Sequence, residues 1–330
     1  MKHPSTWNKS DLHQHLQHAH KLEMWTIPLY LTALYSIKDL KKLKHIDYPD
    51  AAKLIFSVVI QEMLHLELVC NISNALGVSP KFSIPVYDEK KGIPFIHPEK
   101  HYLPEFLKGY SVKPQALNYN SLQLFCAIEL PHPKKEIVWG KEKSYNSIAE
   151  LYEALKQGIV HLWEECYVGD NFNTKQKNTF NEYHNTKGKN HGFSQKINSR
   201  DTALKAIDAI IEQGEGADAK KVPADFRPPK VEEGKEYDAS LYKGHLSHYQ
   251  KFKILLLHHK KLPPVYSATR EGHDSVEQRN LDNAFKLFLL EMENDFNSDG
   301  DTMRDSFWDN MFNLRDALTT VWVSGSCPKF

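Results

Sequence analysis

The sequence has few cysteines, and they lie far apart. Its 330 residues include four, at Cys70, Cys126, Cys166 and Cys327. Such spacing forms neither the paired thiolate ligands of a zinc site nor the dense disulfide framework of a small secreted domain. We therefore expect a protein of a reducing compartment, the cytoplasm. Hydrophobic residues make up 41% of the chain, which is enough for a large core.

Long apolar runs and an excess of one charge are also missing. The first 16 residues are polar and rich in histidine, and we find no later stretch that approaches the roughly 20 apolar residues of a membrane span. Lys plus Arg and Asp plus Glu are equal at 42 each, so no net charge attracts nucleic acid or an anionic membrane. We expect no membrane and no nucleic-acid partner, and a small-molecule partner is favoured.

Strand patterns are few, and helical periodicity dominates the chain. Apolar residues recur three and four positions apart over residues 12–38 and 49–76, which predicts two long helices that form a hairpin. Residues 78–113 are rich in proline, glycine and tyrosine without any period, so we expect a long irregular crossover. An exposed loop is predicted at 220–236. Further helices are predicted over residues 115–128, from 147 to at least 162, and over 202–213, 244–259, 276–296 and 303–323.

These elements predict an all-α protein whose helices pack as a bundle. We divide it into a bundle domain at residues 1–260 and a C-terminal helical extension at 261–330 that packs on the bundle.

A carboxylate occupies a core position of the first long helix. Glu23 lies on the same stripe as Leu16, Ala19 and Tyr30. Burial of an unpaired carboxylate costs several kcal/mol, so Glu23 needs a metal, a basic partner or a proton. The basic partner and the protonated acid are the structural alternatives to a metal ligand.

The second long helix carries a carboxylate and an imidazole on its apolar face. Glu62 and His65 are three residues apart, so both side chains leave the same side of the helix. In di-iron and di-manganese bundles, two helices each give one Glu and the other two each give Glu-x-x-His. Glu23, Glu62 and His65 match half of that set. Hard oxygen ligands with one imidazole per metal favour iron, with manganese as the alternative, over structural zinc.

Several motifs around these residues resemble a known family. They are Leu22-Glu23, Thr26-Ile27-Pro28, Glu62-Met63-Leu64-His65, Asn74-Ala75-Leu76-Gly77, Ile128-Glu129-Leu130-Pro131 and Ser247-His248-Tyr249. Together they resemble the ferritin-like domain named after iminophenyl-pyruvate dimer synthase of the violacein and rebeccamycin pathways. The resemblance covers roughly residues 10–255 and is strongest in the first 80. It implies a ferritin-like four-helix bundle with a di-iron centre, in an enzyme of oxidative secondary metabolism.

The other half of the site has two carboxylate candidates. Glu150 follows Ser147 by three residues, so it is either a ligand or the glutamate of a capping box. Periodicity favours Glu215, which continues an apolar face, over Glu212, which falls on a polar face.

The second imidazole has one candidate. The Glu-x-x-His pattern of these bundles requires a histidine three residues after Glu215, but that position is Asp218. His248 lies on the apolar face of the following helix and supplies an imidazole from there, with a packed core histidine as the alternative. The predicted metal ligands are Glu23, Glu62, His65, Glu150, Glu215 and His248.

We therefore expect a non-haem di-iron oxidoreductase or oxygenase with two iron ions per chain. It activates dioxygen or peroxide and oxidises a small, amino-acid-derived substrate. Two alternatives are kept, a ferroxidase or iron-handling protein and a metal-free helical scaffold. A homodimer is kept as one alternative for the oligomeric state.

Overall fold

The computed structural model describes residues 2–96, 103–131, 145–169, 174–180, 196–215, 246–269 and 275–330. Within these residues it has eight α-helices, and its only β-type pairings are isolated bridges, so the predicted all-α class is confirmed. The loop expected at 220–236 and Asp218 lie outside the described residues.

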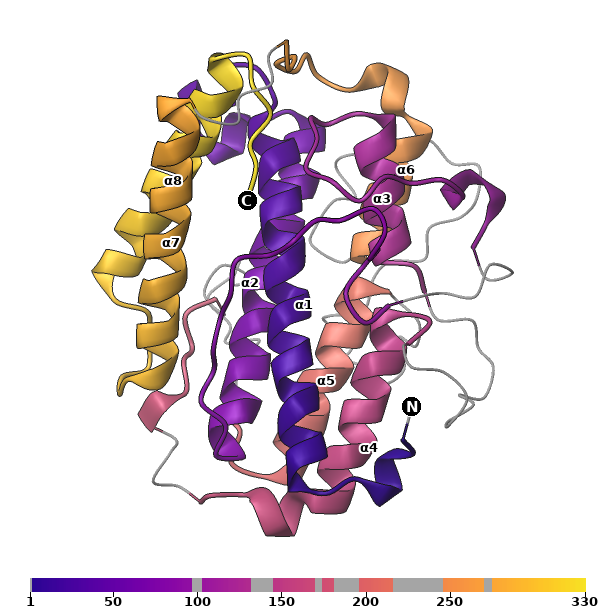
Figure 1. Cartoon of the computed structure of the whole chain (residues 1–330), viewed down its shortest axis with the longest axis vertical. Helices are drawn as coiled ribbons and strands as arrows, with labels where there is room; N and C mark the ends of the chain where they lie inside the picture. Colours follow the sequence, from indigo (N-terminus) through magenta and orange to yellow (C-terminus); the bar gives the residue numbers. More distant parts are fainter. Residues whose placement is uncertain are drawn as a thin grey trace.

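Helices α1 (Lys9–Tyr35) and α2 (Asp50–Ala75) form the predicted long hairpin (Figure 1). A capping box begins α1, because the Asp11 amide donates to Asn8 Oδ1 at 3.0 Å and the Asn8 amide donates to Asp11 Oδ2 at 2.8 Å. The N-cap is thus Asn8, and α1 begins at Lys9, three residues before the predicted range of 12–38.

Two shorter helices fill each of the other two positions of the bundle. They are α3 (Tyr119–Ile128) with α4 (Ile148–Cys166), and α5 (Arg200–Gly214) with α6 (His248–Leu257). α3 packs against α6, α4 packs against α5, and α2 contacts both α5 and α6. In the view of Figure 1, α3 lies above α4 and α6 lies above α5, so each pair together matches the length of α1. Both interruptions fall in the middle of the bundle.

The predicted crossover between α2 and α3 runs along the outside of α1. Trp25 Nε1 donates to the Val86 carbonyl at 3.0 Å, and the Tyr87 hydroxyl donates to the Trp25 carbonyl at 2.9 Å. Near its end, the Leu117 amide donates to Ser36 Oγ, just beyond the end of α1, at 2.9 Å. The crossover therefore spans the bundle, and α3 starts beside the end of α1 and runs antiparallel to it (Figure 1).

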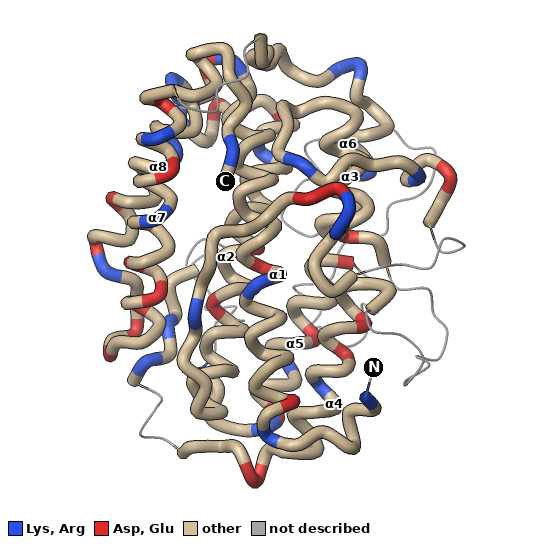
Figure 2. Tube along the Cα trace, in the orientation of Figure 1, with Lys and Arg blue, Asp and Glu red and all other residues tan. Residues whose placement is uncertain are grey.

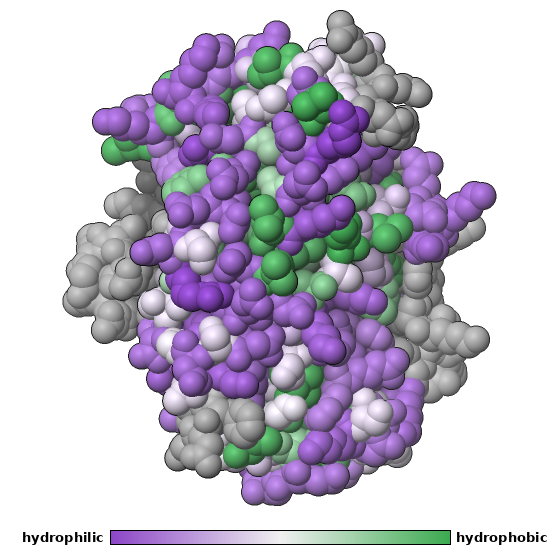
Figure 3. Space-filling model, turned by 60° about the vertical axis from the view of Figure 1, so that its left-hand side comes forward, coloured by the Kyte–Doolittle hydropathy of each residue, from purple (hydrophilic) through white to green (hydrophobic). Residues whose placement is uncertain are grey.

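Helices α7 (Val276–Asn297) and α8 (Asp305–Val323) form a second hairpin beside the bundle. Their buried apolar side chains join the same core as those of α1 and α2. On the side that carries this hairpin, apolar residues lie scattered among hydrophilic ones (Figure 3). Charges of both signs are distributed along the chain, as the equal numbers of acidic and basic residues predict (Figure 2).

The sequence of α2 corrects one expectation. By length and composition this helix could cross a membrane, although no such stretch was expected. However, 83% of its most apolar 18-residue window is buried inside the protein, and the core helix of a globular protein passes the same test. α2 is therefore the central helix of the core.

The N-terminus is held against α4 at a glycine. The Trp7 side chain is only 3% exposed, and a Cβ atom at Gly158 would overlap its ring. We expect Gly158→Ala to lower the free energy of unfolding by about 1–2 kcal/mol, since the clash outweighs the better helix propensity of alanine. Urea unfolding measures this, with exposed His161→Ala on the same helix as control. An equal or higher stability of Gly158→Ala would show that the Trp7 contact is not tight.

Candidate metal centre

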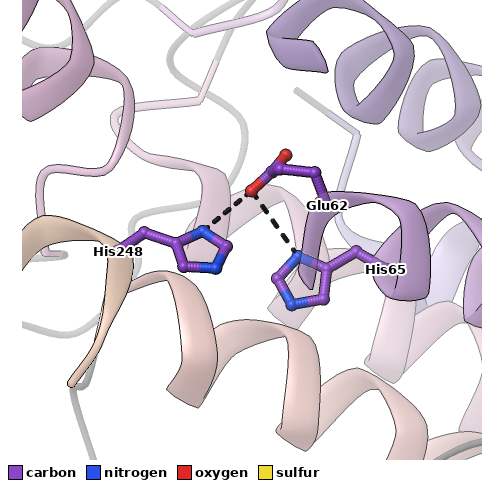
Figure 4. Close-up of side chains that lie close together, drawn as sticks. All are labelled: Glu62, His65 and His248. Atoms are coloured by element: carbon purple, nitrogen blue, oxygen red, sulfur yellow. Dashed lines mark ion pairs between the residues drawn. The ribbon is translucent and has the colours of Figure 1, made fainter. Parts of the chain in front are cut away.

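Side chains from α2 and α6 meet where the bundle helices are interrupted. Glu62 and His65 project from α2, and His248 projects from the first turn of α6 (Figure 4). One ligand atom from each of the three lies within 4.8 Å of the others, and all three side chains are buried. The group has the residue types and the spacing of a metal site.

Glu62 is the centre of this group. Its Oε1 atom lies 2.8 Å from His248 Nδ1 and 3.9 Å from His65 Nδ1 (Figure 4). Its Oε2 atom accepts a hydrogen bond from Thr26 Oγ1 at 2.5 Å. One oxygen of the carboxylate thus faces both imidazoles while the other is anchored to α1.

A second carboxylate lies beside each imidazole. Glu23 Oε2 lies 3.7 Å from His65 Nδ1, and Glu129 Oε1 lies 3.5 Å from His248 Nδ1. The centre therefore has two similar halves. Each half offers one imidazole nitrogen and one carboxylate of its own, and Glu62 is shared between them.

Two buried tyrosines orient the outer carboxylates. The Tyr152 hydroxyl donates to Glu23 Oε1, and the Tyr30 hydroxyl donates to Glu129 Oε1 at 2.6 Å. Each tyrosine engages an oxygen of its carboxylate and limits the rotation of that group. Hydrogen bonds of this kind fix ligand geometry around metal sites.

The two imidazoles have different surroundings. His65 Nε2 lies 2.9 Å from Gln213 Oε1, an acceptor, so the proton sits on Nε2 and the Nδ1 lone pair faces Glu23 and Glu62. His248 Nδ1 lies 2.8 Å from Glu62 Oε1 and 3.5 Å from Glu129 Oε1, so this nitrogen faces two carboxylates. His248 Nε2 is buried and makes no hydrogen bond within the described residues.

The centre concentrates acidic groups in the core. Burial raises the pKa of Glu23 to about 8, with the negative charge of Glu129 adding to the effect and the Tyr152 hydrogen bond opposing it. Burial likewise raises the pKa of Glu62 to about 7. Burial lowers the pKa of His65 to about 4, so this imidazole is neutral at neutral pH. Burial opposes a charge on His248, but the charge of Glu129 and hydrogen bonds to Glu129 and Glu62 raise its pKa. Burial likewise opposes the charge of Glu129, and His248 lowers the pKa of that carboxyl, so these two groups form an ion pair. Glu23 and Glu62 keep raised pKa values, so this single ion pair does not compensate all three carboxylates.

A buried lysine side chain lies near the metal centre. Lys251, one turn after His248, is 1% exposed and donates a hydrogen bond to Gln61 Oε1. Burial lowers its pKa to about 7, although the charges of Glu129 and Glu62 oppose the change. Sequence analysis missed Lys251, because a lysine on an apolar helix face is usually explained by its long stem reaching solvent.

Four of the six predicted ligands come together in the structure: Glu23, Glu62, His65 and His248. The other two hydrogen-bond to backbone amides. The Asn146 amide donates to Glu150 Oε2 at 2.5 Å, and the Ala149 amide donates to Glu215 Oε1 at 2.7 Å. Glu150 therefore lies at the start of α4, where Ser147 Oγ accepts from its amide, but its own carboxylate binds the amide of Asn146 and not that of Ser147, so the predicted capping box is only half formed. Glu215 also lies at the start of α4.

Glu129 stands in the centre where Glu150 was expected. It is the residue that follows the last turn of α3 and is 2% exposed. A signal for it existed, because it follows the buried Leu122 and Phe125 by seven and four residues. The motif Ile128-Glu129-Leu130-Pro131 also belongs to the family resemblance. Glu129 was not predicted as a ligand because it lies just beyond the end of the predicted helix at residue 128.

Glu212 was assigned to a polar helix face, and this is wrong. The side chain is 2% exposed, and the neighbouring Gln213 contacts His65. The last turn of α5 is enclosed on all sides, because Glu212, Gln213, Gly214 and Glu215 are all buried. Periodicity fails there because this turn has no solvent-facing side.

Comparisons with known proteins agree with this architecture. A family model described as Ferritin-like matches residues 16–257. A solved structure, the crystal structure of a ferritin like protein from Caulobacter vibrioides, is similar with 27% identity and a TM-score of 0.75. The match covers 98% of this chain and 99% of that one. A search of curated proteins found no match.

The raised pKa of Glu23 predicts how metal-free protein responds to pH. The folded state keeps a proton on Glu23 up to about pH 8, whereas the unfolded state loses it near 4.5. The free energy of unfolding should therefore fall as pH rises between these values, by about 1.4 kcal/mol per pH unit from this group. Glu23→Gln, which mimics the protonated acid, should remove that part of the decrease.

Urea unfolding of metal-free protein between about pH 5 and about pH 8 measures the difference. Exposed Glu164→Gln on α4 is the control and should follow the unmodified protein. If the curve for Glu23→Gln ran parallel to that of the unmodified protein, Glu23 would titrate as an ordinary carboxylate.

Proposed function

Because the chain belongs to the ferritin-like family, which includes di-iron proteins, we propose that its buried centre holds two metal ions, iron in the first place, and that the protein is an oxidoreductase. The observation that carries the proposal is the pair of similar halves that share Glu62. Each half combines carboxylate oxygen with one imidazole nitrogen, the donor set that suits iron and manganese.

The residues present fit such a pair of ions. Glu23 and His65 would hold one ion, Glu129 and His248 would hold the other, and Glu62 would bridge them. The raised pKa values of Glu23 and Glu62 support this, because a bound cation would stabilise the charged carboxylates that burial disfavours.

Glu212 is the candidate for a sixth ligand. It is buried at the end of α5, next to the residue that orients His65. A carboxylate from the fourth bundle position completes the set of four carboxylates and two imidazoles known for such bundles.

Iron in such a centre supplies electrons for the reduction of dioxygen or peroxide. The chain would contribute positioning and protons. Gln213 keeps the Nδ1 lone pair of His65 directed at the centre, and the hydroxyls of Tyr30 and Tyr152 each donate a hydrogen bond to an outer carboxylate. Lys251 Nζ is a further buried proton donor one turn from His248.

Aromatic side chains shield one side of the centre from water. The ring of Tyr30 packs against Phe125 at 4.7 Å and against Phe252 at 4.9 Å between centroids. A dry surrounding strengthens the electrostatic interactions of the carboxylates. We propose a small, amino-acid-derived substrate of secondary metabolism, and this part rests on the resemblance of the sequence motifs. A location in the cytoplasm is proposed from the few, widely spaced cysteines.

Iron loading and oxygen consumption together test the proposal. Protein reconstituted without air with ferrous iron should retain about two irons per chain. On exposure to air it should consume dioxygen, measured with an oxygen electrode, and should then oxidise a member of a panel of aromatic amino acids and their keto acids. Continued uptake far beyond two irons per chain would instead indicate iron storage. Absence of bound iron would indicate a structural bundle.

A pair of matched variants tests the ligand assignment. Glu129→Gln should lose most of the iron, because glutamine provides no negative charge to a cation. Glu150→Gln should keep about two irons per chain, since its carboxylate binds the Asn146 amide. Metal analysis by plasma mass spectrometry measures both, with circular dichroism to verify helix content. The opposite pattern would restore Glu150 as the ligand and remove Glu129.

A further inference from the structure

A cavity of about 670 Å³ lies apart from the metal centre. It is bounded by Tyr87 of the crossover, the approach to α3 at 113–118, the segment 265–268 after α6, and the end of α8 with the C-terminal tail. None of the residues of the metal centre lines it. Its volume is within the range of about 300–1,000 Å³ that small-molecule sites occupy.

Aromatic rings form part of the cavity wall, and two of them are fixed to α1. Trp322 Nε1 donates to the Thr32 carbonyl at 3.0 Å, and the Tyr87 hydroxyl donates to the Trp25 carbonyl at 2.9 Å. Trp322 is 1% exposed and supports the wall from behind, whereas the half-buried Tyr87 has ring surface left for a ligand and needs no reordering when one binds.

The C-terminal tail is also held in place. Gln278 of α7 makes two hydrogen bonds with the backbone of Lys329, at 2.8 Å and 3.2 Å. The turn that directs the tail has Gly325 with φ of +84°, and a Cβ atom there would lie 2.9 Å from Thr269 Oγ1. The cavity is therefore built by ordered contacts.

The polar groups of the wall favour an anion. Lys113 and Lys329 both line the cavity, and no Asp or Glu is among the described residues that line it. Burial raises the pKa of the Cys327 thiol, another lining group, to about 11, while the positive charges of the two lysines oppose that change. The amide nitrogen of Gln115 is buried and has no hydrogen-bond partner among the described residues, so it can donate to a ligand.

We propose that this cavity binds a small aromatic anion, with its ring against Tyr87 and its carboxylate facing Lys113 and Gln115. A carboxylate matches an ammonium group and a free amide donor, and charge-assisted hydrogen bonds of this kind are strong. The proposal is independent of the metal centre.

Naphthalene-1-acetate and the neutral naphthalene-1-acetamide are suitable probes, because they share a ring system and differ in charge. Isothermal titration should show one site per chain for the acid and at least about tenfold weaker binding of the amide. Lys113→Met should weaken binding of the acid by about tenfold and leave the amide almost unchanged. Exposed Lys81→Met, outside the cavity, is the control and should bind like the unmodified protein.

Alkylation of Cys327 locates the bound probe. The other three cysteines are buried, and this one is half-buried in the cavity wall. Bound acid should slow the reaction of Cys327 with N-ethylmaleimide, measured by peptide mass spectrometry. Equal binding of acid and amide, no binding of the acid, or binding that neither Lys113→Met nor Cys327 alkylation senses would each overturn the proposal.

Discussion

Three carboxylates, Glu23, Glu62 and Glu129, lie 2–3% exposed in the middle of the bundle, and the surrounding structure is arranged around them. Burial of carboxylates is unfavourable unless each one finds hydrogen bonds, a proton or a cation. The Thr26 and two tyrosine hydroxyls supply the hydrogen bonds. The remaining demand for positive charge is what a pair of metal ions would meet.

The charge of the centre also explains its surroundings. Within the part of the chain that the structure describes, buried Lys251 has no carboxylate at hydrogen-bond distance and donates to the neutral Gln61. A direct ion pair with Glu62 or Glu129 would neutralise a group that a cation needs. Lys251, on α6, instead binds Gln61, the neighbour of Glu62 on α2. Its amino group there reduces the negative potential of the region without forming a direct ion pair with Glu62 or Glu129. The same logic makes the neutral Gln213, and not an acid, the partner of His65.

The sequence could predict the parts of the fold that depend on local periodicity. Helices α1, α2, α7 and α8 were expected within a few residues of their observed ends, because each has a long apolar stripe and a clear stop. Glu23, Glu62 and His65 were found on the same basis, since a charged residue within an apolar stripe stands out. His248 was expected from its apolar face and from the absence of a histidine after Glu215.

The parts that could not be predicted depend on contacts between helix ends. Glu129 follows the final turn of α3, Glu212 lies in a turn enclosed on every side, and Gln213 matters through His65, 148 residues away. Periodicity assigns a residue to a face of one continuous helix. It contains no information about which helices are interrupted, or about which end packs against which.

The break between α3 and α4 and the break between α5 and α6 contact each other, and these contacts explain the position of Glu215. Glu215, at the end of α5, accepts the Ala149 amide at the start of α4, so an acid stabilises the positive end of a helix from the neighbouring bundle position. Gly214 allows α5 to end beside α3, because a Cβ atom there would lie 3.3 Å from Glu129 Oε2. In a Glu-x-x-His pattern that begins at Glu212, the position of the histidine is occupied by Glu215. Instead α5 ends with Glu215 as its C-cap, and the next described helix in this bundle position, α6, begins with His248. Glu215 thereby becomes a helix cap, and the imidazole that faces Glu62 comes from α6.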